Sequence, residues 1–240
     1  MLTGFILWVM PEHRDFAWAV FLVMLAPTAT AAPAVVRMRG GDPGLVIGGV
    51  LLQHLLVAFL VPFWVWALHD WMPISASLAG GWDLPIRILL QVLPLVVIPF
   101  ALAKLLRWLW PKGANTIAQK QPLSLFLWAI AVFFVVAKAR AGVGALLDLS
   151  GTYTGVRLIV SIAMASLVLC ICQFYYGRRL SPQGLGEAGA QVLGQKNTIL
   201  AIWIGGTWFG PWASLGPLFY ILWQNLYIAW VTGHSIESKS

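Results

Sequence analysis

The sequence predicts an all-α integral membrane protein. Of its 240 residues, 60% are hydrophobic and only 10% are charged, whereas charged residues make up about 25% of a typical soluble domain. The 14 Trp and 5 Tyr residues suit the aromatic belts that form at the two membrane–water interfaces. We therefore expect the chain to be surrounded by a lipid bilayer.

The net charge of +7 does not indicate nucleic-acid binding. The basic residues lie mostly between apolar stretches and form no stripe or face, which orientation in a membrane explains better. No GxxxxGK[ST], HExxH or GxSxG motif occurs, so the sequence offers no machinery for ATP-driven or hydrolytic chemistry. We predict no catalytic residues, no enzyme activity and no nucleic-acid partner.

Seven stretches are long enough to cross a bilayer, for which a helix needs about 20 apolar residues. They are 16–36, 44–68, 85–110, 122–146, 153–177, 185–208 and 211–232. A shorter apolar stretch, 2–10, ends at Pro11 and cannot cross alone. It is expected to be a half-helix, so the single membrane domain over 1–240 is expected to be incomplete at its N-terminus.

The basic residues at the ends of these stretches predict the orientation. One side collects Arg37, Arg39, Lys104, Arg107, Lys112, Lys120, Arg178, Arg179 and Lys239. The other side has Arg14, Arg87, Lys138, Arg140 and Arg157. Because cytoplasmic loops carry the excess of Lys and Arg, the first side and the C-terminus are expected in the cytoplasm. The short loops favour a bacterial inner membrane.

Two of the stretches contain helix-breaking residues. In Ala26 to Gly41, Pro27 and Pro33 surround two threonines, and proline opens a helix because it lacks a backbone donor. The second break is the sequence GQKNT, residues 194–198. A pair of interrupted helices in corresponding places is typical of a transporter binding site. Four uninterrupted stretches separate the two breaks, which suits the two halves of an inverted repeat.

Lys196 is a charged residue inside a predicted membrane span, and such residues are usually functional because their insertion is costly. Its ammonium could donate to backbone carbonyls freed at the break, bind an organic anion, or release a proton. Alternatively, Lys196 could reach a nearby surface or pair with Glu187.

Other polar side chains in the spans have two readings. His54, next to Gln53, could relay protons, or it could be a core histidine hydrogen-bonded to a neighbouring helix. Thr28 and Thr30 could bind substrate or merely satisfy the opened backbone. The sequence leaves these alternatives open.

The stretch GQKNTILAIWIGGTWFGPWASLGPLFYILWQN, from Gly194 onwards, resembles the ninth and tenth helices of the bile acid:sodium symporter family. Ala26 to Pro62 is similar to the fourth and fifth helices of that family. The resemblance implies ten helices in two inverted repeats, with the broken fourth and ninth helices crossing at the membrane midplane. It also implies a core domain over 16–68 and 153–232, a panel domain over 85–146, and the absence of the first two to three helices.

The chain departs from the sodium-dependent members at the expected ion sites. Where they have a Glu followed by Gln-Asn, this chain has Val192, then Lys196 and Asn197. The family's Ser-Asn pair falls on Ala32 and Pro33. Sodium remains a candidate ion, but most of its ligands are missing, and no other cofactor is implied.

The resemblance therefore implies a secondary transporter that moves an organic anion, a carboxylate or bile-acid-like molecule, by alternating access and without strict sodium coupling. The expected substrate-binding residues are Thr28, Thr30, Asn197, Thr198, Gln224 and Asn225, and the expected ion-coupling residues are Lys196, His54 and Gln53. The alternative is a truncated, non-transporting homologue that acts as a binding or regulatory subunit. A homodimer could complete the panel domain in trans.

Overall fold

The computed structural model describes residues 14–67, 83–119 and 152–237, with scattered positions between 126 and 147. The predicted half-helix 2–10 and most of the predicted span 122–146 lie outside these residues. The described elements are α2 (Arg14–Leu25), α3 (Ala32–Met38), α4 (Gly44–Ala67), α5 (Asp83–Leu109), α6 (Pro111–Gln119), α8 (Thr152–Arg179), α9 (Gly186–Gly194), α10 (Thr198–Ile204), the π-helix η4 (Gly205–Phe209) and α11 (Pro211–Glu237). The predicted all-α class is confirmed for this part of the chain.

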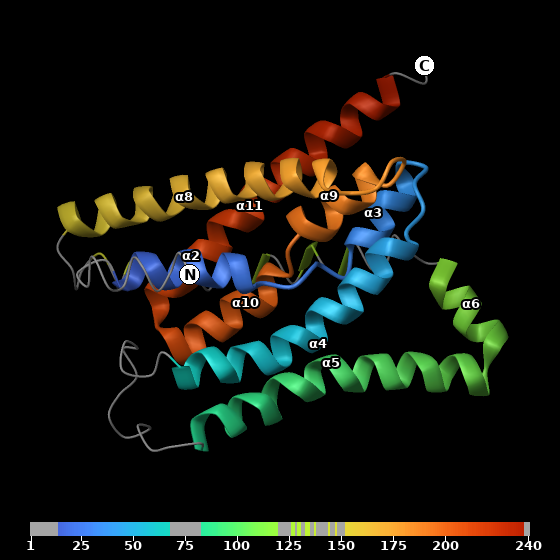
Figure 1. Cartoon of the computed structure of the whole chain (residues 1–240), viewed down its shortest axis with the longest axis horizontal. Coiled ribbons are helices and arrows are strands. Elements are labelled where there is room, and N and C mark those ends of the chain that lie inside the picture. Colours follow the sequence, from blue (N-terminus) through green and yellow to red (C-terminus); the bar gives the residue numbers. More distant parts are fainter. Residues whose placement is uncertain are drawn as a thin grey trace.

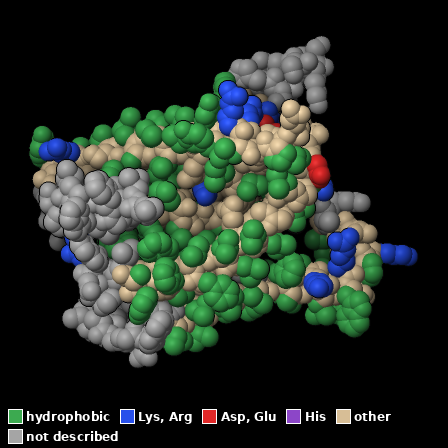
Figure 2. Space-filling view, viewed as in Figure 1, with side chains coloured by type: hydrophobic (Ala, Val, Ile, Leu, Met, Phe, Trp, Pro, Cys, Tyr) green, Lys and Arg blue, Asp and Glu red, His purple; other side chains and the backbone are tan. Residues whose placement is uncertain are grey.

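Two of the described helices are long and apolar enough to cross a membrane by length and composition. They cover Gly44–Trp64 in α4 and Tyr153–Arg179 in α8, and Thr198–Phe209 forms a shorter apolar helix. Large hydrophobic side chains such as Leu52 and Phe59 on α4 are exposed. Figure 2 shows hydrophobic side chains over much of one face of the helices, with most Lys and Arg side chains toward its edges. This distribution suits a lipid environment.

The elements pack around α2, which lies between α8, α10 and α11 (Figure 1). Trp18 and Phe21 of α2 form an aromatic cluster with Phe209, with ring centroids 5.0 Å and 6.0 Å from that of Phe209. Gly216 lets α11 approach α2 closely, since a Cβ there would overlap the backbone carbonyl of Ala19. α4 and α5 run side by side on the other side of α10 (Figure 1).

Two helices are interrupted. Six residues, Ala26 to Ala31, separate α2 from α3, and Gln195 to Asn197 separate α9 from α10. Pro27 lies in the first interruption and Pro33 lies in the first turn of α3, where its missing N–H is not needed. The short helix α6 has no counterpart among the predicted spans.

Candidate functional site

The two interruptions are joined by hydrogen bonds between their backbones. Thr28 and Lys196 form an isolated antiparallel β-bridge. On either side of it, Ala29 N donates to Gln195 O at 2.7 Å and Asn197 N donates to Pro27 O at 2.6 Å. Each break thus supplies partners for backbone groups that the other has freed, which satisfies them without water at membrane depth.

Glutamine side chains complete the bonding of both breaks. Gln53 Oε1, from α4, accepts from Thr28 N at 3.0 Å. Gln224, from α11, accepts from Lys196 N at 2.8 Å through Oε1 and donates to Lys196 O at 3.3 Å through Nε2. The Thr28 hydroxyl donates to Val192 O at 2.6 Å. These side chains therefore use their hydrogen-bonding groups to stabilise the two breaks.

Tyr220 is a further residue of this site that sequence reasoning did not find. Its hydroxyl lies 2.6 Å from Gly194 O, the last residue of α9, and 2.8 Å from Oε1 of Gln173. The side chain is fully buried. A tyrosine in the middle of an apolar span was the available signal, because a buried phenol needs a hydrogen-bond partner.

Asn197 links the second break to α4. Its Oδ1 accepts from Leu200 N at 3.3 Å and so caps α10, while its Nδ2 lies 3.1 Å from His54 Nε2. His54 Nδ1 lies 2.8 Å from the carbonyl oxygen of Val50. Since a carbonyl only accepts, Nδ1 carries the proton and Nε2 accepts from Asn197. This assignment, inferred from the bonds, makes His54 a neutral histidine that is held on both ring nitrogens.

Lys196 is only 4% exposed. Its backbone is bonded to Gln224 on both sides, but none of the residues in 14–67, 83–119 and 152–237 bonds or pairs with its ammonium. The side chain therefore places a cation, without an anionic partner from the described residues, at the junction of the two breaks. Burying a charge without a counter-ion opposes folding.

A cavity of about 630 Å³ lies on one side of the junction. It is lined by Thr30, Val50, Leu51, His54, Pro99, Phe100, Asn197, Ile199, Leu200 and Trp203. Most of this lining is apolar, and α5 forms one wall through Pro99 and Phe100. Such a pocket, with a few polar groups in an apolar lining, has the size and chemistry of a small-molecule site.

The structure sorts the predicted site residues into groups. Thr30, His54 and Asn197 line the cavity. Thr28, Lys196, Thr198 and Gln224 are buried at or beside the junction of the breaks. Gln53 is half-buried and bonded to the first break through Thr28 N and to α9 through Val192 O. Asn225 is half-buried on α11 and does not line the cavity.

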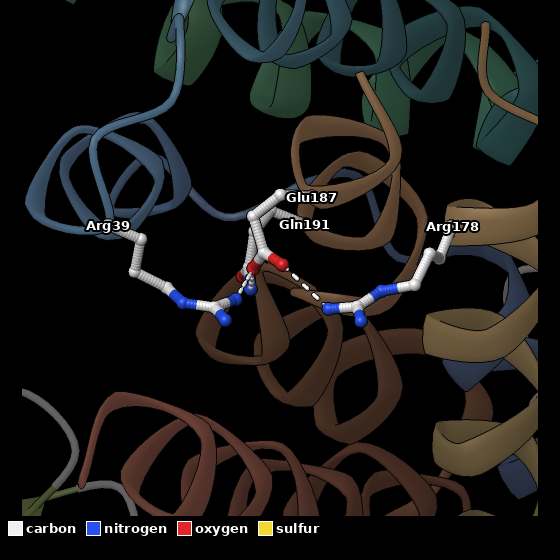
Figure 3. A network of polar contacts seen from close by, with 4 residues as sticks. All are labelled: Arg39, Arg178, Glu187 and Gln191. Atoms are coloured by element: carbon white, nitrogen blue, oxygen red, sulfur yellow. Dashed lines mark hydrogen bonds and ion pairs between the residues drawn. The ribbon is translucent and has the colours of Figure 1, made fainter. Parts of the chain in front are cut away.

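Glu187, at the start of α9, does not pair with Lys196 in the part of the chain that is described. Its carboxylate instead pairs with Arg39, just beyond α3, and with Arg178 at 2.6 Å near the end of α8 (Figure 3). Gln191, one turn along α9, donates to Glu187 at 3.4 Å. The side chains of Glu187 and Arg39 are 23% and 17% exposed. This group, the Glu187 cluster, ties three helix ends together.

The fold and the site together define a helical membrane protein with two interrupted helices that meet beside a cavity. The family model that matches the chain is that of the sodium bile acid symporter family, over residues 1–146 of 240. The chain belongs to this family, as its sequence led us to expect. It is therefore an integral membrane protein of a transporter family. A comparison with curated proteins gave no match.

The matched residues include the first break but end before the second. The family match therefore does not extend to Lys196 and its neighbours.

Proposed function

We propose that the protein is a secondary transporter that moves an organic anion, a carboxylate or bile-acid-like molecule, by alternating access. Membership of the sodium bile acid symporter family supports transport. The cavity beside the joined breaks, lined by Thr30, His54 and Asn197, supports a substrate site there. In this proposal the joined breaks and α4 belong to a core that moves against α5, which belongs to the panel.

The two interrupted segments, α2–α3 and α9–α10, would be corresponding elements of two inverted repeats. The ends of α3, α5 and α8 that carry Arg and Lys lie toward the same side of the molecule (Figure 1). That arrangement supports placing this side in the cytoplasm. We propose a bacterial inner membrane, with the C-terminus in the cytoplasm, and a homodimer.

The observation that carries the proposal is the buried cation of Lys196 at the junction of the breaks. Half-helix ends and freed carbonyls carry partial negative charge, which a sodium ion would otherwise compensate. Lys196 is covalently fixed at this place and needs no ion from solution. The transporter is therefore proposed to work without strict sodium coupling, and a proton gradient or the substrate gradient alone would drive it.

The test is uptake of a panel of labelled carboxylates into proteoliposomes, with sodium and proton gradients imposed separately. Uptake by the native chain should be indifferent to sodium. Lys196→Gln should lose uptake or acquire sodium dependence, while Lys104→Gln, at an exposed position on α5, should behave as the native chain. Strong sodium dependence of the native chain would refute a resident cation. Absence of uptake for every carboxylate would instead favour a non-transporting binding subunit.

A further inference from the structure

A row of polar side chains runs along α9 toward Lys196. Glu187 and Gln191 lie one turn apart on one face of α9, and Gln195, the C-cap residue that follows the helix, continues this spacing and donates its backbone N–H to Gln191 O. Both glutamines are deeply buried, with 1% and 3% exposure. Three polar side chains in succession on the buried face of a membrane helix are costly, and such rows commonly mark pathways.

The row lies between two apolar contacts of α9. Ala188 and Val192 pack on one side against Ala32 and Val36 of α3 and Val46 of α4. On the other side, Ala190 packs with Phe174 of α8 and Tyr220 of α11, within a second cluster. With about 100° between successive helical residues, Gln191 and Gln195 point between these two contacts.

The row contains two unsatisfied acceptors, and Lys196 follows the second of them directly in the chain. Among the described residues, neither Gln191 Oε1 nor Gln195 Oε1 receives a hydrogen bond, although both atoms are buried. Leaving such an oxygen without a donor costs about 1–3 kcal/mol. Turning the Gln191 amide over would not help, because its Nε2 already donates to Glu187. Water satisfies this pattern, since one molecule can donate to amide oxygens and accept from an ammonium.

The row also has an entrance. It begins at the Glu187 cluster, where the Arg178 side chain is 51% exposed (Figure 3). The cavity lined by Thr30, His54 and Asn197 involves none of the three residues of the row. The row thus leads from the residue before Lys196 to a surface that the cavity lining does not include.

We propose that the row Glu187–Gln191–Gln195 holds a file of water molecules that connects the Lys196 ammonium to the aqueous face beside the Glu187 cluster. The lysine is then hydrated through residues that do not line the substrate cavity. This inference rests on the role proposed for Lys196 as a resident cation. It explains how the ammonium can remain charged at membrane depth, because it is hydrated. The water file itself requires no transport.

The experiment is hydroxyl-radical labelling of the purified chain by a brief X-ray pulse, which modifies side chains next to bound water. Modification is read by mass spectrometry at Gln195 and Lys196. Labelling should be strong there in the native chain although both side chains are buried. Gln191→Leu, which interrupts the row, should reduce it several-fold. Ser166→Ala is the matched control, since Ser166 is equally buried but bonds Gly216 O at the α8–α11 contact.

Gln191→Glu keeps the row polar and should retain the labelling. If Gln191→Leu folds poorly, this variant shows whether substitution at position 191 by itself lowers the labelling or whether loss of the bound water does. Native labelling no stronger than that of buried apolar residues such as Ile162 would overturn the proposal. Equal labelling in the native chain and in a folded Gln191→Leu variant would also overturn it. Loss of labelling when sodium chloride replaces choline chloride would mean that an ion occupies the row instead. Uptake is not measured, so the outcome is independent of whether the chain transports a carboxylate.

Discussion

Thr28 and Lys196 lie opposite each other in an antiparallel β-bridge, although they are far apart in the sequence. The bridge and the two flanking bonds, Ala29 N to Gln195 O and Asn197 N to Pro27 O, hold the two helix breaks against each other. If one break moved without the other, several backbone groups would be left unpaired at membrane depth, where lipid offers no hydrogen-bond partners. The two breaks are therefore expected to move as one body.

Lys196→Met should stabilise the fold while it removes the function proposed for the lysine. Methionine has a similar length and no charge, and its substitution for the buried cation is expected to raise the free energy of unfolding by at most about 2–3 kcal/mol, since the proposed water file already offsets part of the cost of burial. Thermal unfolding in detergent measures this change. Lys104→Met, at an exposed position on α5, should leave the midpoint nearly unchanged. A lower midpoint for Lys196→Met would show that the ammonium has a stabilising partner.

Two neighbouring threonines should respond differently to replacement by valine. Thr28→Val removes the buried hydroxyl that donates to Val192 O at 2.6 Å and should cost about 1–2 kcal/mol of stability. Thr30 is exposed in the cavity, so Thr30→Val should change stability by less than about 0.5 kcal/mol. Its effect should instead appear as a raised KM for uptake. An unchanged KM would exclude Thr30 from the substrate site.

Asn197 should be sensitive to the chemistry of its side chain. Asn197→Ala loses both the cap on Leu200 N and the bond to His54, and loss of the cap alone costs about 1 kcal/mol. Asn197→Ser can still cap α10 and should recover that part of the stability but not the bond to His54. The comparison is made by thermal unfolding of both variants. Equal midpoints for Ala and Ser would mean that the cap contributes little.

The Glu187 cluster should respond asymmetrically to loss of its charges. Glu187→Gln leaves the mostly buried Arg39 without its carboxylate and should cost about 1–3 kcal/mol. Burial, and secondarily the nearby Arg178, already lowers the pKa of Arg39, yet a guanidinium stays charged and cannot relieve the loss by deprotonation. Arg178→Gln affects a half-exposed side chain and should cost at most about 1 kcal/mol. Unfolding midpoints that rank the two variants in the opposite order would contradict this account.

Gly216 should tolerate no side chain. A Cβ at this position of α11 would overlap the Ala19 carbonyl of α2, so Gly216→Ala is expected to push the helices apart at a cost of about 1–3 kcal/mol. Gly48 of α4 has no atom within 4 Å of an added Cβ. Gly48→Ala should therefore be neutral or stabilising by up to about 1 kcal/mol. Unfolding midpoints of the two variants provide the measurement.

The helical class and the two breaks follow from local chemistry that a sequence displays directly. Long apolar stretches admit only helices in a membrane, Pro27 stops a helix because it lacks a backbone donor, and GQKNT is recognised by its polar residues within an apolar stretch. The family resemblance was confirmed over residues 1–146, which include the first break but not GQKNT. The short helix α6 was not predicted, since it is too short and too polar for a search based on apolar stretches.

Which polar residues hold the breaks together and which line the cavity depends on tertiary contacts that the local sequence does not show. Thr28 and Thr30 are two residues apart and chemically identical, yet one is bonded to α9 and the other faces the cavity. The sequence also left the ion-pair partner of Glu187 undetermined. In the structure Glu187 pairs with Arg39 and Arg178 and not with Lys196. The positions of Tyr220 and Gln191 matter only because α8, α9 and α11 meet around them.

Lys196 is part of the polypeptide, and Gln224 holds its backbone through two hydrogen bonds. In the proposed mechanism this changes the net charge that crosses the membrane in each cycle. A cation that is part of the polypeptide returns with it in every cycle, unlike a sodium ion that is released on the far side. The net charge moved is then that of the substrate alone. For a monovalent anion, an inside-negative potential of about 100 mV opposes entry by about 2.3 kcal/mol, equivalent to a roughly fiftyfold concentration ratio. In the proposed mechanism without proton coupling, net transport would therefore be outward at any smaller inward gradient.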